Sequence, residues 1–140
     1  MVDEIRGMKE LIEELNGFPA RVQKNVLRQS VFRGAQELAE VARRNAPVSK
    51  TSKHPGKLRD SIKPYRGGGT RGMVVARVEV GAFYAKWVEF GNSRAPAHPF
   101  LIPAFNKERE RILERIQKGL ATEIEKKMLA GIQGRFRDAP

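Results

Sequence analysis

Apolar residues recur at three- and four-residue spacing in the first third of the chain, a period that predicts amphipathic helices. The first such stretch runs from Asp3 to Leu15 and is followed by Asn16-Gly17, a pair suited to ending a helix. The second runs from Pro19 to about Ala46, and Pro19 fits a first helical turn because its missing N–H leaves no bond unmade. The sequence therefore predicts a short helix and then a long one.

A two-residue alternation replaces this period further along the chain. Between Met73 and Gly81, one side of the extended chain carries Val74, Ala76, Val78 and Val80, and the other carries Val75, Arg77 and Glu79. This is the pattern of a half-buried strand. Residues 58–63 fit either a strand or a short helix, and we favour a strand beginning near Ser61. Together the two segments predict a hairpin across Gly67-Gly68-Gly69.

Helical spacing returns from Phe105 to Met128 and predicts a long C-terminal helix with mixed charges outside. The predicted fold class is α+β, with a small, mainly antiparallel sheet of about three to four strands. This sheet is expected to pack against a long helix from the N-terminal half and a long C-terminal helix. We expect one domain over 1–131 and a loose tail over 132–140, where no periodicity remains.

The chain of 140 residues carries 27 basic and 16 acidic side chains, a net charge of +11. Residues 43–77 hold ten basic residues against the single acid Asp60, and residues 48–72 have the composition of a mobile loop. The candidate contacts to DNA or to an acidic partner are Lys50, Lys53, Lys57, Arg59, Lys63, Arg66 and Arg71. Because Tyr65 is the one aromatic residue there, a base-stacking platform is poorly supported. A solvated loop or a protein contact is the alternative.

Residues suited to catalysis or metal binding are scarce. The chain has no cysteine and two histidines, and no nucleophile, base or phosphate-loop arrangement is recognisable. We predict no enzyme activity, cofactor, metal site or small-molecule substrate. No apolar run is long enough to span a bilayer, and the start lacks the features of a signal peptide, so we expect no membrane contact and synthesis in a cytoplasm.

Aromatic residues gather between Tyr84 and Phe90, which include the one tryptophan. We expect this segment to fill the core, with Trp87 or Phe100 as an anchor. A salt bridge or a hydrogen bond to a turn is the expected role of Glu89. Gly91 then permits a sharp turn or a positive φ.

This part of the chain resembles the tail-component family of long-tailed bacteriophages, typified by gene product ten of the lambdoid phage HK-ninety-seven. The family pattern is Tyr-Ala, then Val-Glu-Phe-Gly, then Pro-Ala-x-Pro-Phe-Leu-x-Pro-Ala. The positions of this motif segment are Tyr84, Trp87, Val88, Glu89, Phe90, Gly91, Pro96, Pro99, Phe100, Leu101 and Pro103. Upstream agreement at Ala42, Ala46-Pro47 and Ser61-Ile62 extends the similarity to all but about the last dozen residues. The chain departs from the pattern at His54-Pro55-Gly56 and at Asn92, where threonine is frequent.

The resemblance implies a structural protein of the virion, in the neck or tail-completion region, with no catalysis. It implies a homo-oligomeric ring that contacts connector and tail proteins and joins head to tail or terminates the tail tube. DNA would pass through the lumen of such a ring, close to the residues that line it. The alternative function is nucleic-acid binding by the basic region 43–77. Edge pairing between small sheets is one device for assembly, although the sequence does not say which edge takes part.

Overall fold

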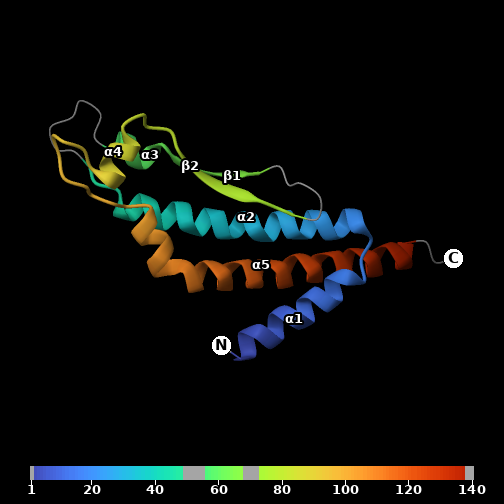
Figure 1. Cartoon of the computed structure of the whole chain (residues 1–140). Coiled ribbons are helices and arrows are strands. Elements are labelled where there is room, and N and C mark those ends of the chain that lie inside the picture. Colours follow the sequence, from blue (N-terminus) through green and yellow to red (C-terminus); the bar gives the residue numbers. More distant parts are fainter. Residues whose placement is uncertain (1, 49–55, 68–72, 138–140) are drawn as a thin grey trace.

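A computed structural model describes residues 2–48, 56–67 and 73–137 of the chain (Figure 1). Five helices and two strands lie in these ranges. In chain order they are α1 (Val2–Asn16), α2 (Ala20–Asn45), α3 (Lys57–Asp60), β1 (Ile62–Arg66), β2 (Ala76–Val80), α4 (Ala85–Phe90) and α5 (Ile102–Arg137). The α+β class and both long helices are as the sequence predicts.

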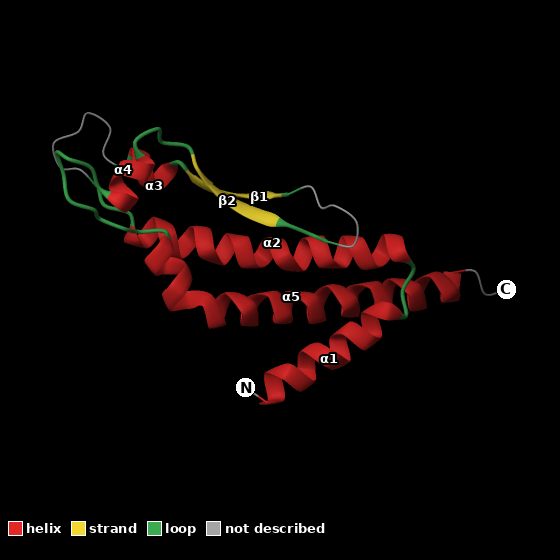
Figure 2. Ribbon diagram, in the orientation of Figure 1, coloured by secondary structure: helices red, strands yellow, loops and turns green. Residues whose placement is uncertain are grey.

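Helices α2 and α5 lie side by side and form the body of the molecule (Figure 2). The buried face of α2 carries mostly small residues, which lets the two helices approach closely: Ser30, Gly34, Ala35, Ala39 and Ala42. A Cβ added at Gly34 would lie 2.6 Å from Cγ1 of Ile116 on α5, so a larger residue here would push the helices apart.

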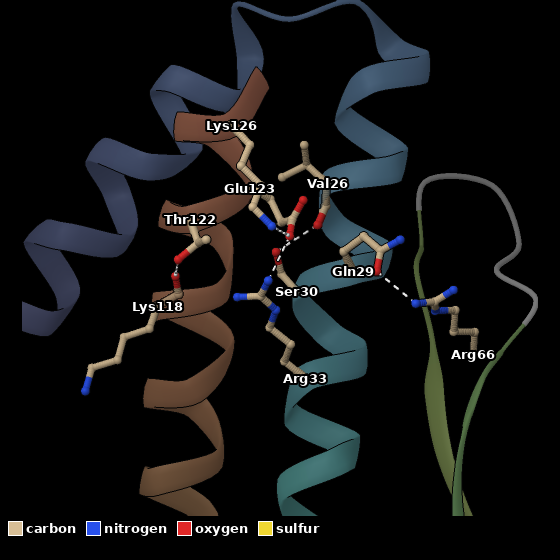
Figure 3. A network of polar contacts seen from close by, with 9 residues as sticks. All are labelled: Val26, Gln29, Ser30, Arg33, Arg66, Lys118, Thr122, Glu123 and Lys126. Atoms are coloured by element: carbon tan, nitrogen blue, oxygen red, sulfur yellow. Dashed lines mark hydrogen bonds and ion pairs between the residues drawn. The ribbon is translucent and has the colours of Figure 1, made fainter. Parts of the chain in front are cut away.

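Ionic contacts border this helix pair on its polar side (Figure 3). Arg33 of α2 forms an ion pair with Glu123 of α5 at 2.8 Å, and Lys126 approaches the same carboxylate at 3.6 Å. Buried Ser30 donates its hydroxyl proton to the Val26 carbonyl at 2.7 Å, so its polar group is satisfied within α2.

The β-hairpin covers the face of α2 opposite α5. Strands β1 and β2 pair antiparallel, with Ile62 opposite Val80 and Arg66 opposite Ala76. The predicted hairpin is confirmed, but the described residues contain two strands rather than three or four. The sheet is smaller because the aromatic segment forms helix α4 and the approach to α5 pairs with neither strand.

Two apolar clusters hold the elements together. Near the C-terminal end of α2, Leu58, Ile62, Phe100 and Ala104 pack against alanines of α2. Near its N-terminal end the cluster comprises Leu15, Val26, Leu120 and Ile124. The core is therefore divided between the two ends of α2, and α1 contributes to the second cluster.

The limits of the predicted loop and the end of the C-terminal helix differ from the sequence prediction. Residues 48–72 are not one loop: α3 and β1 occupy 57–66, because Leu58 and Ile62 enter the core. Segments 49–55 and 68–72 of the predicted mobile loop lie outside the described residues. Helix α5 continues to Arg137, past the end near Gly131 that the loss of periodicity suggested.

Candidate assembly surface around helix α4

The motif segment forms helix α4, a loop and the start of α5, and Glu89 joins these parts. Its carboxylate is buried and accepts hydrogen bonds from the backbone N–H groups of Phe100 (2.8 Å), Leu101 (3.0 Å) and Ile102 (2.8 Å). These groups lie at the N-terminus of α5, where backbone donors have no partner within the helix. The alternatives expected for Glu89 were a salt bridge or a hydrogen bond to a turn; the structure shows hydrogen bonds, and they go to the start of a helix 11 to 13 residues further along the chain.

The charge of Glu89 is stabilised in this position. Burial of the carboxyl opposes its ionisation, but the backbone N–H groups of Leu101, Phe100 and Ile102 outweigh burial and lower the pKa of Glu89. The positive end of the α5 dipole acts in the same direction. Glu89 is therefore a structural anion that fixes the angle between α4 and α5.

Gly91 allows the chain to reverse directly after α4. Its φ of 75° lies in the region that favours glycine, and an added Cβ would lie 2.8 Å from the backbone nitrogen of Ala97. The loop then folds back, and the His98 N–H donates to the Val88 carbonyl at 2.8 Å. Asn92 fits this turn because its Oδ1 accepts from the N–H groups of Arg94 and Ala95, both at 2.9 Å.

Phe100 fills the core beneath this junction. It is 1% exposed and belongs to the cluster formed with Leu58, Ile62 and Ala104. The expectation of a core anchor is confirmed for Phe100. Tyr84, Val88 and Leu101 are partly buried against the same cluster, whereas Pro96, Pro99 and Pro103 are exposed.

The expectation is wrong for Trp87, which is 43% exposed. Helical spacing is the reason: Trp87 and Phe90 lie three residues apart on one side of α4, while Val88 and Glu89 turn inward. Phe83 lies in the turn just before the helix, on the side of Trp87. Phe83 and Phe90 are 75% and 70% exposed. The Phe83 ring meets the rings of Tyr84 and Trp87 edge to face, with centroids 5.3 and 6.0 Å apart. We call Phe83, Trp87 and Phe90 the aromatic surface.

The described basic residues do not form one continuous patch. Lys57 and Arg59 are exposed on α3, and Lys63 is exposed on β1. Arg66 turns towards α2, where its guanidinium lies 4.7 Å from the Phe32 ring centroid and donates to Gln29 at 2.9 Å (Figure 3). The other candidates, Lys50, Lys53 and Arg71, lie outside the described residues.

Lys57 and Lys63 border a shallow groove of about 260 Å³ on the outer side of the hairpin, together with Tyr65 and Glu79. Within the described ranges, no three histidine or acidic side chains come together as metal ligands would. Over the same ranges, none of the helices has both the length and the apolar character needed to cross a bilayer.

Sequence reasoning missed one structural arginine. Arg43 is the first of the ten basic residues of the 43–77 region, but its Nε and Nη2 both donate to the Ile62 carbonyl, at 3.0 and 2.7 Å. The contact connects residues 19 positions apart, and no local pattern marks it. Arg43 thereby holds the start of β1 against α2.

A family model described as "Bacteriophage HK97-gp10, putative tail-component" matches residues 9–91, more than half of the chain. The chain belongs to this family. No curated protein and no solved structure matches it. In this HK97-gp10 family member, the matched region includes α2, the hairpin and α4, and it ends at Gly91. The resemblance at Pro96–Ala104 therefore rests on the motif residues alone.

Family membership makes the protein a structural component of a bacteriophage tail and places it in the virion. Its contacts are then with other proteins of the phage tail. The aromatic surface lies at the end of the matched region, and its three side chains are exposed in the single chain.

Proposed function

We propose that this tail component acts in the neck or tail-completion region, where it joins head to tail or terminates the tail tube. It assembles as a homo-oligomeric ring through protein interfaces and contacts the neighbouring connector and tail proteins. The observation that carries the proposal is the aromatic surface on α4. Two large aromatic side chains on one side of a six-residue helix, with Phe83 just before it, are more exposed aromatic residues than the fold itself requires.

Such a surface has the composition of an interface centre. Tryptophan and other aromatic residues supply much of the binding energy in protein contacts, because they bury a large area with little loss of side-chain freedom. The buried cap at Glu89 holds α4 fixed, so the aromatic surface is presented in one orientation. A rigid surface loses less entropy on binding than a mobile one.

The test is negative-stain imaging of particles made by the parent phage or prophage when this gene carries an early stop codon. We expect DNA-filled heads beside unattached tails for a joining role, or tails of uncontrolled length for a terminating role. Infectious particles of normal shape would refute the proposal.

Nucleic-acid binding is the second candidate function. Neither Lys57 nor Lys63 has an ion-pair partner among the described residues, so both charges are available to a phosphate backbone. This candidate predicts that DNA affinity falls steeply with salt and that neutralising Lys50, Lys53 and Lys57 reduces the slope. Salt-insensitive or absent binding by the isolated protein would argue against it.

A further inference from the structure

The two edges of the hairpin differ in their free hydrogen-bonding groups. The Gly81 N–H donates to the Ser61 carbonyl and the Gly67 N–H donates to the Val75 carbonyl. Along antiparallel strands, residue pairs that exchange hydrogen bonds alternate with pairs that do not. These two bonds therefore determine which residues of each strand bond within the hairpin. The backbone groups of residues 62, 64 and 66 on β1, and of 76, 78 and 80 on β2, therefore point away from the partner strand.

The β1 edge cannot accept another strand. Pro64 has no N–H to donate, and the carbonyl of Ile62 already accepts two hydrogen bonds from Arg43. These are the devices by which proteins protect an edge from pairing.

The β2 edge has no such protection. Within the described part of the chain, no residue bonds to the outward N–H and C=O groups of Ala76, Val78 and Val80. An unpaired edge of this kind is a template for a further strand, and a hairpin of two strands gains stability from additional ones.

We propose that β2 pairs with β2 of a second copy of this chain, antiparallel and centred on Val78. In that register Val78 lies opposite Val78 of the second copy. Arg77 lies opposite Glu79 of the second copy, and the two-fold symmetry repeats this pair. The outward N–H and C=O groups of residues 76, 78 and 80 then form hydrogen bonds between the two copies. Residue 77 of one copy and residue 79 of the other form a pair without hydrogen bonds, with Cα atoms about 4.5 Å apart.

Charge complementarity indicates that the strand added at the β2 edge comes from a second copy of this chain. Arg77 and Glu79 already form an ion pair at 2.6 Å on the outer side of β2, and both side chains are about half exposed. Two such strands in antiparallel register bring four charges together in alternating sign. Opposite charges directly across a strand pair are favourable, whereas like charges are unfavourable.

The same register covers apolar side chains beyond both ends of β2. Met73 precedes β2 and Phe83 follows it, so antiparallel pairing brings Met73 of one copy to the strand end where Phe83 of the second copy lies. These residues are 60% and 75% exposed in the single chain. The inner sides of the two hairpins, each covered by α2, then lie on the same face of a four-stranded sheet. The edge and the outlying apolar residues become buried together.

This inference does not depend on the proposed ring. A two-fold contact uses the same surface on both copies and stops at a dimer, so a ring would require a different surface. The aromatic residues Trp87 and Phe90 remain available for that second contact.

The experiment compares charge-reversal variants by sedimentation over a wide concentration range. Arg77→Glu and Glu79→Arg each place like charges opposite one another in the dimer, and each should raise the dimer Kd at least about tenfold. A mixture of the two variants should form a heterodimer as tight as the wild-type dimer. The double variant R77E/E79R should also dimerise, because its strand is again complementary to itself.

Arg94→Glu is the matched control, since it makes the same change of charge in a loop outside the strand and should leave the Kd unchanged. An unaltered thermal midpoint shows that each variant is folded. A wild-type chain that stays monomeric throughout would overturn the proposal. A dimer or larger assembly that the reversals leave unchanged, or a variant mixture that does not recover pairing, would overturn it as well.

Discussion

Phe100 and Trp87 are aromatic residues of the same motif segment, and the fold uses them in opposite ways. Phe100 is 1% exposed within the core, whereas Trp87 is 43% exposed on the outer side of α4. Glu89 lies between these two regions and connects them through its hydrogen bonds to the start of α5. The comparison indicates that one part of the motif segment builds the junction and the other part is left exposed at the surface.

The largest effect should come from Phe100→Ala, which removes a large side chain from the buried cluster. Cavity formation predicts a loss of about 3–5 kcal/mol in the free energy of unfolding. Denaturant unfolding followed by circular dichroism would measure it. A loss below about 1 kcal/mol would show that the core does not depend on this side chain.

Glu89→Ala should come next, with a loss of about 2–3 kcal/mol, because it leaves backbone donors at the start of α5 without their acceptor. Glu89→Gln keeps the size of the side chain but removes the charge, and it should have a smaller effect at neutral pH. Denaturant unfolding of both variants beside the wild type would rank them. Equal stability of all three would contradict the role of Glu89 as a cap.

The lowered pKa of Glu89 also predicts how stability depends on pH. Its pKa is lower in the folded chain than in the unfolded one. The unfolded state therefore binds more protons, and the contribution of Glu89 is fully present above the unfolded pKa and is lost as pH falls through the folded pKa. Thermal midpoints measured from neutral to acid pH should fall less steeply for Glu89→Gln than for the wild type. Parallel curves would rule out this carboxyl as the titrating group.

Gly91→Ala tests the loop that places α5 beside α4. A φ of 75° and the close approach to Ala97 disfavour a Cβ, so we expect a loss of about 1–2 kcal/mol. Gly131→Ala is a matched control, because nothing lies within 4 Å of a Cβ there. If the two substitutions had the same effect on the thermal midpoint, the turn would not require glycine.

The smallest effect on stability should come from Trp87→Glu. The side chain is almost half exposed, so we expect a loss of about 1 kcal/mol or less. Its effect on binding should be large, because a charge at the centre of an apolar contact is strongly unfavourable. A thermal midpoint lowered as far as in Phe100→Ala would place Trp87 in the core after all.

The sequence was sufficient to predict the elements whose periodicity is local. The two long helices and the hairpin follow from spacings of three to four and of two residues, and Pro19 and Pro47 mark the limits of α2. Helix α4 was missed because six residues are too few to show a helical period. Without it, the aromatic residues could be assigned to the core but not divided between two sides.

The contacts that form the junction could not be predicted in detail. Glu89 meets backbone groups 11 to 13 residues ahead, and Arg43 meets a carbonyl 19 residues ahead. Backbone donors and acceptors are the same in every residue, so the sequence gives no sign of which ones a side chain will reach. The prediction that Glu89 makes a hydrogen bond was correct, and the structure identifies the backbone groups that donate to it.

The central claim, that the outer side of α4 serves assembly while the buried junction serves folding, is tested most directly by complementation. Phage carrying an early stop codon in this gene would be supplied with the wild-type chain or with Trp87→Glu, and the particles would be counted by electron microscopy. We predict that the folded variant gives few complete particles, with heads and tails separated or tails of uncontrolled length. Complete infectious particles in wild-type numbers would contradict the claim.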